Sequence, residues 1–312
     1  MAFTAKDVKA LREQTGVGMM ECKKALVEAD GDMDKAVEFL RERGLAAAQK
    51  KASRIAAEGV VLPYYDKAAK KGVVLEVNSE TDFVAKNDKF MNFVEGVAKT
   101  ILATNPADVE ALKETKFDGT DRTVTETLND LVLAIGENMK VRRFELMDGV
   151  VSTYIHAGGS VGVMVGFDVA DEAKADTAEF EDMGKNVAMQ IAAMSPEYLD
   201  KDAVPAEVVE REQGILAAQM KEDPKMASKP EAVLAKIAQG KMGKYYSEVC
   251  LVEQEFVRSD IFSGSVKGYI DSVAKSLGTE IKCNGFIRMM KGDGLEKREE
   301  NFAEEIAKQI NG

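Results

Sequence analysis

The stretch Glu76-Val-Asn-Ser-Glu-Thr-Asp-Phe-Val-Ala-Lys-Asn-Asp88 predicts a polar loop between a β-strand and an α-helix. Before it, residues 71–75 form an apolar run with the length and composition of a strand. After it, apolar residues from Phe90 to Ile101 recur at spacings of three and four, as on one face of a helix. Asp88 is placed to cap the start of that helix. The sequence therefore predicts strand, loop and helix in succession.

The same pattern occurs a second time in the chain. Residues 58–106 align without a gap onto residues 148–196, at a constant offset of 90. The identities include apolar positions of the predicted helix, such as Phe90 and Phe180. In-phase identity over this length indicates two copies of one unit, a β-hairpin followed by a helix. Two copies predict a pair of related subdomains, since a solenoid needs at least three.

Phe83 is the unusual residue in the polar loop. A phenylalanine there either folds back onto the core or projects toward a partner, and most phenylalanines are buried. At the repeat offset, however, Asp82 and Phe83 correspond to Glu172 and Ala173. A core position of the shared fold would keep a large apolar side chain in both copies. The comparison of the two copies therefore favours projection of Phe83.

Outside the repeat, several segments are predicted to be helical. Residues 4–43 carry three short apolar stripes separated by glycine-containing turns, which predicts a small three-helix domain. Residues 44–57 are rich in alanine and basic side chains, a composition typical of a helical linker. Further on, Glu207–Met220 and Glu231–Tyr246 flank a proline-containing turn. These two segments predict an antiparallel helical hairpin.

Strand-like runs return after this hairpin, at Glu248–Phe256 and Glu280–Met290, and a last helix is predicted at Glu296–Ile310. The hairpin is therefore predicted to be an insertion into the second subdomain of an α+β fold. The predicted organisation is a three-helix domain with its linker at 1–55, a first core subdomain at 56–142, a second core subdomain at 143–291 with the hairpin insertion at about 205–246, and a C-terminal helical module at 292–312.

Composition restricts the classes of function. The chain of 312 residues has a net charge of −12, which disfavours a mainly electrostatic grip on nucleic acid. No apolar run approaches the roughly 18–20 residues that span a bilayer. Three widely spaced cysteines, Cys22, Cys250 and Cys283, fit reduced thiols in a cytoplasm. We therefore expect a cytoplasmic protein without membrane or direct nucleic-acid binding.

Catalytic and cofactor-binding motifs are not found in the sequence. The single histidine, His156, has no cysteine or carboxylate cluster at ligand spacing, so no metal site is predicted. The segment Gly240-Lys-Met-Gly-Lys-Tyr245 lacks both the spacing and the hydroxyl residue of a phosphate-binding loop. We therefore expect binding surfaces, with no enzymatic activity and no cofactor of its own.

Two long stretches are specific enough to indicate one protein family. The first is Leu11-Arg-Glu-Gln-Thr-Gly-Val-Gly-Met-Met-Glu-Cys-Lys-Lys-Ala-Leu26, and the second is Glu76-Val-Asn-Ser-Glu-Thr-Asp-Phe-Val-Ala-Lys86. Both resemble the signature segments of the elongation factor Ts family. Shorter segments, Asp30-Gly-Asp-Met33, Tyr154-Ile-His156 and Gly285-Phe-Ile-Arg288, are similar to the same family. The resemblance extends over essentially the whole chain.

This resemblance implies a nucleotide-exchange factor that binds elongation factor Tu in its GDP form and accelerates GDP release. It implies that the three-helix unit is a ubiquitin-associated-like domain docking on the GTPase, and that the final helix is an additional contact. It also implies that a loop enters the partner near its nucleotide and magnesium site. The residues implied to contact the partner are Thr81, Asp82, Phe83 and Val84 in this loop, Leu11, Arg12, Thr15, Gly16, Gly18, Met19, Met20 and Lys23 in the N-terminal domain, and His156, Gly158 and Gly159 in the second subdomain.

Composition alone leaves a second class of function open. A non-catalytic scaffold or binding module with a ubiquitin-associated-like domain would have the same charge and the same lack of catalytic motifs. A measurement of GDP release from elongation factor Tu distinguishes the two classes. The charged helical hairpin is in addition a candidate surface for pairing two copies of the chain as a homodimer.

Overall fold

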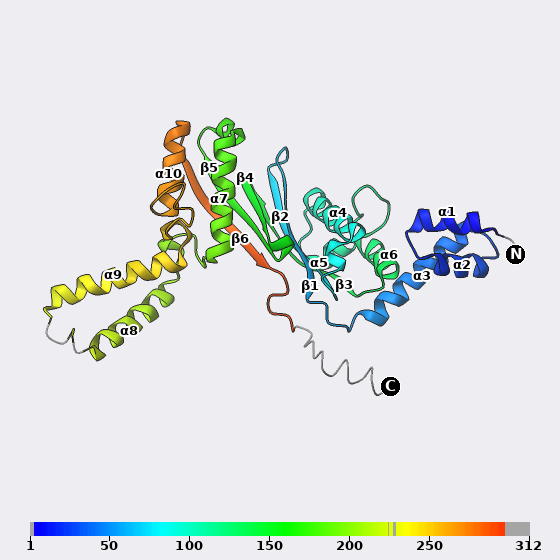
Figure 1. Cartoon of the computed structure of the whole chain (residues 1–312), viewed down its shortest axis with the longest axis horizontal. Helices are drawn as coiled ribbons and strands as arrows, with labels where there is room; N and C mark the ends of the chain where they lie inside the picture. The colour runs from blue at the N-terminus through cyan, green and yellow to red at the C-terminus, as the bar shows by residue number, and fades with distance from the viewer. Residues whose placement is uncertain (1–2, 224, 227–228, 297–312) are drawn as a thin grey trace.

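The computed structural model describes residues 3–223, 225–226 and 229–296. Within them it confirms the α+β class, because helices accompany two three-stranded antiparallel sheets. The molecule is elongated, with the N-terminal helices at one end, a helical hairpin at the other and both sheets between them (Figure 1). The helix predicted at Glu296–Ile310 lies, apart from its first residue, outside the described residues.

The N-terminal domain contains three helices around a small core of its own. Thr4 and Asp7 form the capping box of the first helix, and Gly16 ends it in the left-handed conformation with φ 71°. The third helix continues through most of the predicted linker, because its alanine-rich sequence favours helix. The helices are α1 (Ala5–Thr15), α2 (Met19–Glu28) and α3 (Met33–Lys51).

The first repeat unit packs a helix and a return strand onto the predicted hairpin. Its sheet has the order β1-β2-β3, and the apolar face of α4 covers it with Phe90, Val97 and Ile101. The cap of α4 is Asn87, whose side chain accepts from the Lys89 amide at 2.9 Å, so the predicted cap at Asp88 is wrong by one residue. The elements are β1 (Glu58–Asp66), β2 (Lys71–Ser79), η1 (Val84–Lys86), α4 (Asp88–Thr104), α5 (Val109–Lys113), α6 (Val124–Ile135) and β3 (Met139–Asp148).

The second repeat unit has the same order of elements, and the sequence repeat is confirmed. Strand β5 and helix α7 lie at an offset of 90 from β2 and α4 at both ends. Its sheet has the order β4-β5-β6. The elements are β4 (Val150–His156), η2 (Ala157–Gly159), β5 (Val161–Val169), η3 (Glu172–Asp176), α7 (Ala178–Met194), α10 (Val266–Leu277) and β6 (Ile281–Met290).

The structure extends the duplication beyond the part that sequence comparison finds. The α6–β3 pair corresponds to the α10–β6 pair at a constant offset of 142. Both helices begin at a hydroxyl cap, Thr123 or Ser265, and both end at a left-handed glycine, Gly136 or Gly278. Each unit thus contains a β-hairpin, a helix on that hairpin, a later helix and a return strand. The offset between equivalent residues grows from 90 in the first part of the unit to 142 in the second, a difference of 52 residues.

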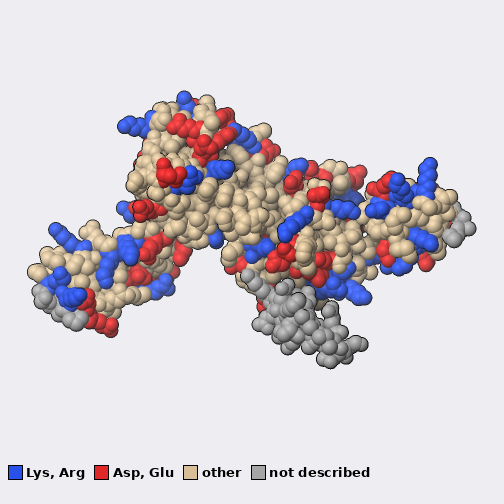
Figure 2. Space-filling model, viewed as in Figure 1, with Lys and Arg blue, Asp and Glu red and all other residues tan. Residues whose placement is uncertain are grey.

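These 52 extra residues contain the predicted insertion. They follow α7 and include a helical hairpin whose first helix buries no side chain. Figure 2 shows blue and red side chains interspersed over this hairpin, as expected for a solvated projection. The inserted elements are η4 (Lys201–Ala203), α8 (Ala206–Glu222), α9 (Glu231–Val249) and η5 (Leu251–Glu253).

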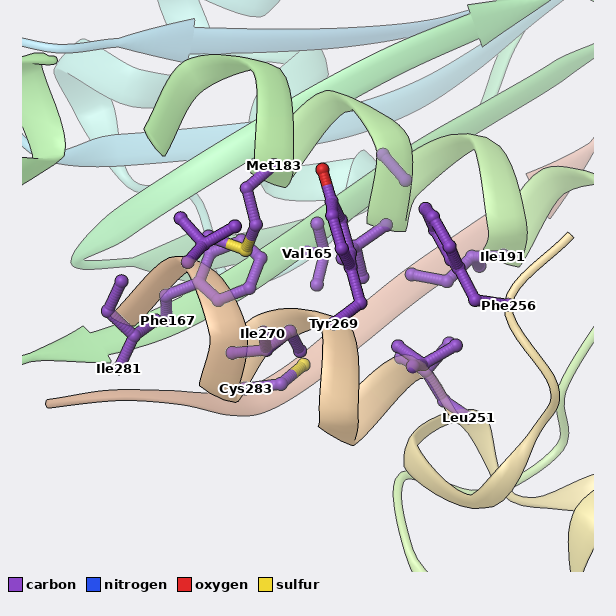
Figure 3. Packing of buried hydrophobic residues seen from close by; sticks show 14 of the residues in the cluster. Val165, Phe167, Met183, Ile191, Leu251, Phe256, Tyr269, Ile270, Ile281 and Cys283 are labelled. Atoms are coloured by element: carbon purple, nitrogen blue, oxygen red, sulfur yellow. The ribbon is translucent and has the colours of Figure 1, made fainter. Parts of the chain in front are cut away.

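The strand predicted at Glu248–Phe256 is wrong. Helix α9 continues to Val249 and is followed by the short helix η5. The apolar side chains of this segment fill the second core instead of forming a ladder: Leu251 is fully buried, and Phe256 stacks on Tyr269 at 4.2 Å between ring centroids. Figure 3 shows both side chains directed into the core that α7 and α10 enclose. An apolar run of this length fits either arrangement, because burial alone produces it.

The two sheets pack against each other through the faces that their helices leave open. This contact buries a cluster that includes Val61, Met164 and Met289. Gly72 and Gly162, which are equivalent in the repeat, permit the close approach: an added Cβ would lie 2.6 Å from Met164 Sδ or from Val61 Cγ1, respectively. The two repeat units therefore form one body in the order helices, sheet, sheet, helices.

We predict that the helical hairpin is dispensable for folding. Replacing residues 207–246 with a short Gly/Ser linker should leave a cooperative thermal transition. Helix α8 buries no side chain, and Met242, the buried residue of α9, belongs to neither repeat unit's core cluster. Circular dichroism during heating tests this. As a comparison, Phe256→Ala should cost roughly 3–5 kcal/mol, since that ring lies in the core. Loss of the cooperative transition in the linker variant would contradict the prediction.

Candidate functional site

The loop between β2 and α4 presents an aromatic side chain to solvent. Phe83 is 77% exposed, which confirms that the ring does not fold back onto the core. Its neighbours are charged: Asp82 pairs with Lys86 at 3.2 Å, and the Lys86 ammonium lies 5.9 Å from the centre of the Phe83 ring. Val84, by contrast, is buried in the first core and anchors the loop. An exposed ring on an anchored loop is the kind of feature that enters a pocket on a partner.

Hydrogen bonds hold the loop just before Phe83. The Thr81 amide and hydroxyl both donate to the carboxylate of Glu137, at 3.0 and 2.7 Å. The Ser79 hydroxyl donates to the Thr81 carbonyl at 2.8 Å. The backbone amide of Asn138 donates to Glu80 Oε1 at 2.6 Å. The turn between α6 and β3 thus supports the backbone that leads to the exposed ring.

The strand below this loop contains a buried carboxylate, Glu76. It accepts from Arg142 at 3.0 Å, from Arg143 at 2.7 Å, and from the Gly292 amide at 2.7 Å. Asn78 donates to it as well, at 2.9 Å. Burial by itself raises the pKa of Glu76, but these hydrogen bonds outweigh it and hold the pKa below its ordinary value. The segment after β6 is thereby fixed to the strand that leads into the loop.

The N-terminal domain exposes part of the predicted contact set. Met19 and Met20 are 42% and 66% exposed, and Arg12, Gly18 and Lys23 are also on the surface. The remaining members serve the fold: Leu11 is buried, the Thr15 hydroxyl donates to the Leu11 carbonyl, and the Gly16 carbonyl accepts from Lys89 at 2.7 Å.

The turn between β4 and β5 carries the third predicted group. His156 and Gly158 are exposed, whereas Gly159 is buried. Gly159 has φ +94°, and an added Cβ would lie 2.2 Å from Val60 Cγ2. Gly159 therefore serves to seat the turn on strand β1, because another residue would be strained and would clash. The exposed part of this group is His156 with its neighbours.

The buried thiols do not form a reactive site. Cys22, Cys250 and Cys283 are free and buried. Burial raises the pKa of Cys250 to about 11 and that of Cys283 to about 12. Among the described residues, no cluster of three or more His, Cys, Asp or Glu side chains could hold a metal ion, and no helix there has the length and apolar character to cross a membrane.

Comparison with known proteins identifies the family. The family model described as Elongation factor TS matches residues 80–293. Elongation factor Ts of Magnetococcus marinus is 45% identical over 315 residues, covering 100% of both chains. Elongation factor Ts of Clostridium perfringens is 47% identical over 309 residues, covering 98% of both chains, and that of Clostridium botulinum is 46% identical over 311 residues, covering 99% of both. The chain belongs to the elongation factor Ts family.

The residues predicted from sequence divide into two groups in the structure. The exposed group is Arg12, Gly18, Met19, Met20, Lys23, Asp82, Phe83, His156 and Gly158. The second group consists of buried or partly buried residues that support those positions, namely Leu11, Thr15, Gly16, Thr81, Val84 and Gly159. Two supporting residues were not predicted from the sequence. Glu137 contacts Thr81 and Lys89 contacts Gly16, which lie 56 and 73 residues away along the chain. The predicted pairing of two copies through the helical hairpin stays a prediction.

Proposed function

We propose that this chain is a guanine-nucleotide exchange factor of translation elongation that binds elongation factor Tu in its GDP form and promotes GDP release, so that GTP can rebind. Full-length membership of the elongation factor Ts family supports the choice of partner. The observation that carries the mechanism is Phe83, a 77% exposed ring on a loop anchored on both sides.

The mechanism requires no covalent chemistry of this chain. A GTPase holds GDP mainly through a phosphate cradle and a bound Mg²⁺. We propose that Asp82 and Phe83 enter the partner near this site and displace elements that support the magnesium. Factor and GDP then weaken each other's binding by the same factor, because coupling between two binding sites is reciprocal. GTP can refill the site once GDP has left.

Two further surfaces would hold the partner in register. In this proposal the exposed methionines Met19 and Met20 of the ubiquitin-associated-like N-terminal domain dock on the GTPase domain, where flexible thioether side chains adapt to the partner's surface. His156 and Gly158 face another domain of the partner. The protein acts in the cytoplasm, without direct contact to nucleic acid or membrane.

Release of labelled GDP from purified elongation factor Tu tests the proposed function. Catalytic amounts of the chain should accelerate the release, and the rate should saturate as the concentration of the chain rises. The same preparation of elongation factor Tu without the chain gives the spontaneous rate. Binding without acceleration would favour the non-catalytic scaffold, and absence of binding would overturn the proposal.

We predict that deleting residues 1–55 weakens binding to elongation factor Tu at least about tenfold, the loss expected when a whole docking domain is removed. The two repeat units should remain folded, because each has a core of its own. Isothermal titration calorimetry measures the affinity. Because α3 also packs on α6, the variant Met20→Asp in the full-length chain provides a second test that leaves this packing intact. Unchanged affinity in both variants would contradict the prediction.

A further inference from the structure

The contact between Thr81 and Glu137 is built to fix a backbone position. One carboxylate accepts from both the amide and the hydroxyl of the same residue, at 3.0 and 2.7 Å. Glu137 comes directly after Gly136, which ends α6 in the left-handed conformation and turns the chain toward the loop. Hydrogen bonds to a charged acceptor are about twice as strong as neutral ones. Thr81 is therefore held in both position and rotamer.

The second repeat unit contains an equivalent contact that is weaker. At the offset of 90, Thr81 corresponds to Asp171, and at the offset of 142, Glu137 corresponds to Thr279. The equivalent hydrogen bond is present there, because the Asp171 amide donates to the Thr279 hydroxyl at 3.0 Å. That bond is single and its acceptor is neutral. The copy that carries the exposed aromatic thus has a double, charged contact at the place where the copy without it has a single neutral one.

Phe83 lies between two fixed points. Thr81, two residues earlier, is held by Glu137, and Val84, one residue later, is buried in the first core. The neighbouring Glu80 adds a third attachment to the same turn, through the Asn138 amide at 2.6 Å. A ring that must displace elements of a partner needs a stiff support, since a compliant loop would yield instead.

The geometry points to Glu137 as a positioning residue for nucleotide exchange, acting through Thr81 to hold Phe83 in the orientation that enters the partner. This inference rests on the proposed exchange function. Glu137 is partly buried beneath the loop. In the proposed mechanism it does not contact the partner itself. Its removal should therefore lower the rate reached at saturation, with little change in how tightly the partner is held.

The test compares Glu137→Ala with Thr279→Ala, which removes the equivalent contact from the copy without the aromatic. Labelled GDP release from elongation factor Tu is measured over a range of factor concentrations. For Glu137→Ala we expect the maximal rate to fall about tenfold and the half-saturating concentration to change less than about twofold, as for an interaction that acts in the exchange step and not in docking. Glu137→Gln, which retains one acceptor, should give an intermediate rate. Thr279→Ala should match the unmodified chain.

Two further measurements separate positioning from a general structural role. In a Phe83→Ala background, Glu137→Ala should have little additional effect on the maximal rate, because both residues act through the same ring. Hydrogen exchange of the Thr81 amide, followed by NMR without any partner, should accelerate in Glu137→Ala while the melting temperature changes little. If Glu137→Ala fails to fold, Glu137→Gln is compared in the same way.

The inference is overturned if Glu137→Ala retains the full maximal rate, if its effect is additive with Phe83→Ala, or if Thr279→Ala is equally impaired. These outcomes differ from failure of the proposed function. In that case the unmodified chain would not accelerate GDP release, although the Thr81 amide would still lose protection in Glu137→Ala.

Discussion

Phe83→Ala is expected to reduce stimulated GDP release about a hundredfold, the scale of a hot-spot aromatic at the centre of an interface. The free energy of unfolding should stay within about 1 kcal/mol of the unmodified chain, because a ring that is 77% exposed contributes little to the core. Binding to elongation factor Tu should weaken less than exchange, since the other docking surfaces remain. GDP release and chemical denaturation of the same preparation measure both quantities.

Two matched variants give this experiment its controls. Ile261→Ala removes another exposed apolar side chain, 46% exposed and on the surface of the second repeat unit beside Glu179 and Tyr269, and should leave exchange unchanged. Phe90→Ala removes a fully buried ring from the first core and should cost roughly 3–5 kcal/mol of stability. Full exchange activity in Phe83→Ala, or a loss of stability as large as that of Phe90→Ala, would show that Phe83 is not the residue that drives release.

The sequence predicted the duplicated scaffold because the repeat leaves side chains of the same size in the same core positions. Phe90 and Phe180 lie in the first turn of equivalent helices and in equivalent cores, and β2 and β5 share their bounds at the offset of 90. The repeat also identified Phe83, because the difference between Phe83 and Ala173 separates a feature of one copy from a feature of the fold. Local patterns were thus sufficient wherever burial determined the residue type.

Contacts between distant parts of the chain could not be predicted in this way. Glu76 lies in the second signature segment, yet its partners Arg142, Arg143 and Gly292 are 66, 67 and 216 residues away. The correspondence of α6–β3 with α10–β6 was missed as well, because the 52-residue difference in offset conceals it from a gapless comparison. The strand predicted at Glu248–Phe256 failed for a related reason, since its apolar residues fill a core that the helices α7 and α10 complete.

Glu76→Gln is expected to lower the free energy of unfolding at pH 7 by about 3 kcal/mol, the lower end of the range for breaking a buried ion pair. The lower end applies because Arg142 and Arg143 keep part of their contact with water, with side chains 19% and 34% exposed. The Gly292 amide would also lose a charged acceptor. The variant should therefore loosen the segment after β6 from the strand that leads to Phe83.

The pH dependence of this difference identifies its cause. The pKa of Glu76 in the folded chain lies below its ordinary value, although burial alone would raise it, because the amide of Gly292, Asn78 and the two arginines stabilise the carboxylate. Its contribution to stability is therefore fully present above the unfolded pKa of about 4.3 and is lost as pH falls through the folded pKa. Denaturation curves of both proteins should converge in acid.

A control variant is Asp271→Asn, which removes an exposed ion pair with Lys267. It should change stability by less than about 1 kcal/mol at any pH. A difference between Glu76→Gln and the unmodified chain that stays constant from pH 7 to pH 3 would mean that lost packing, and not the charge of Glu76, accounts for the effect.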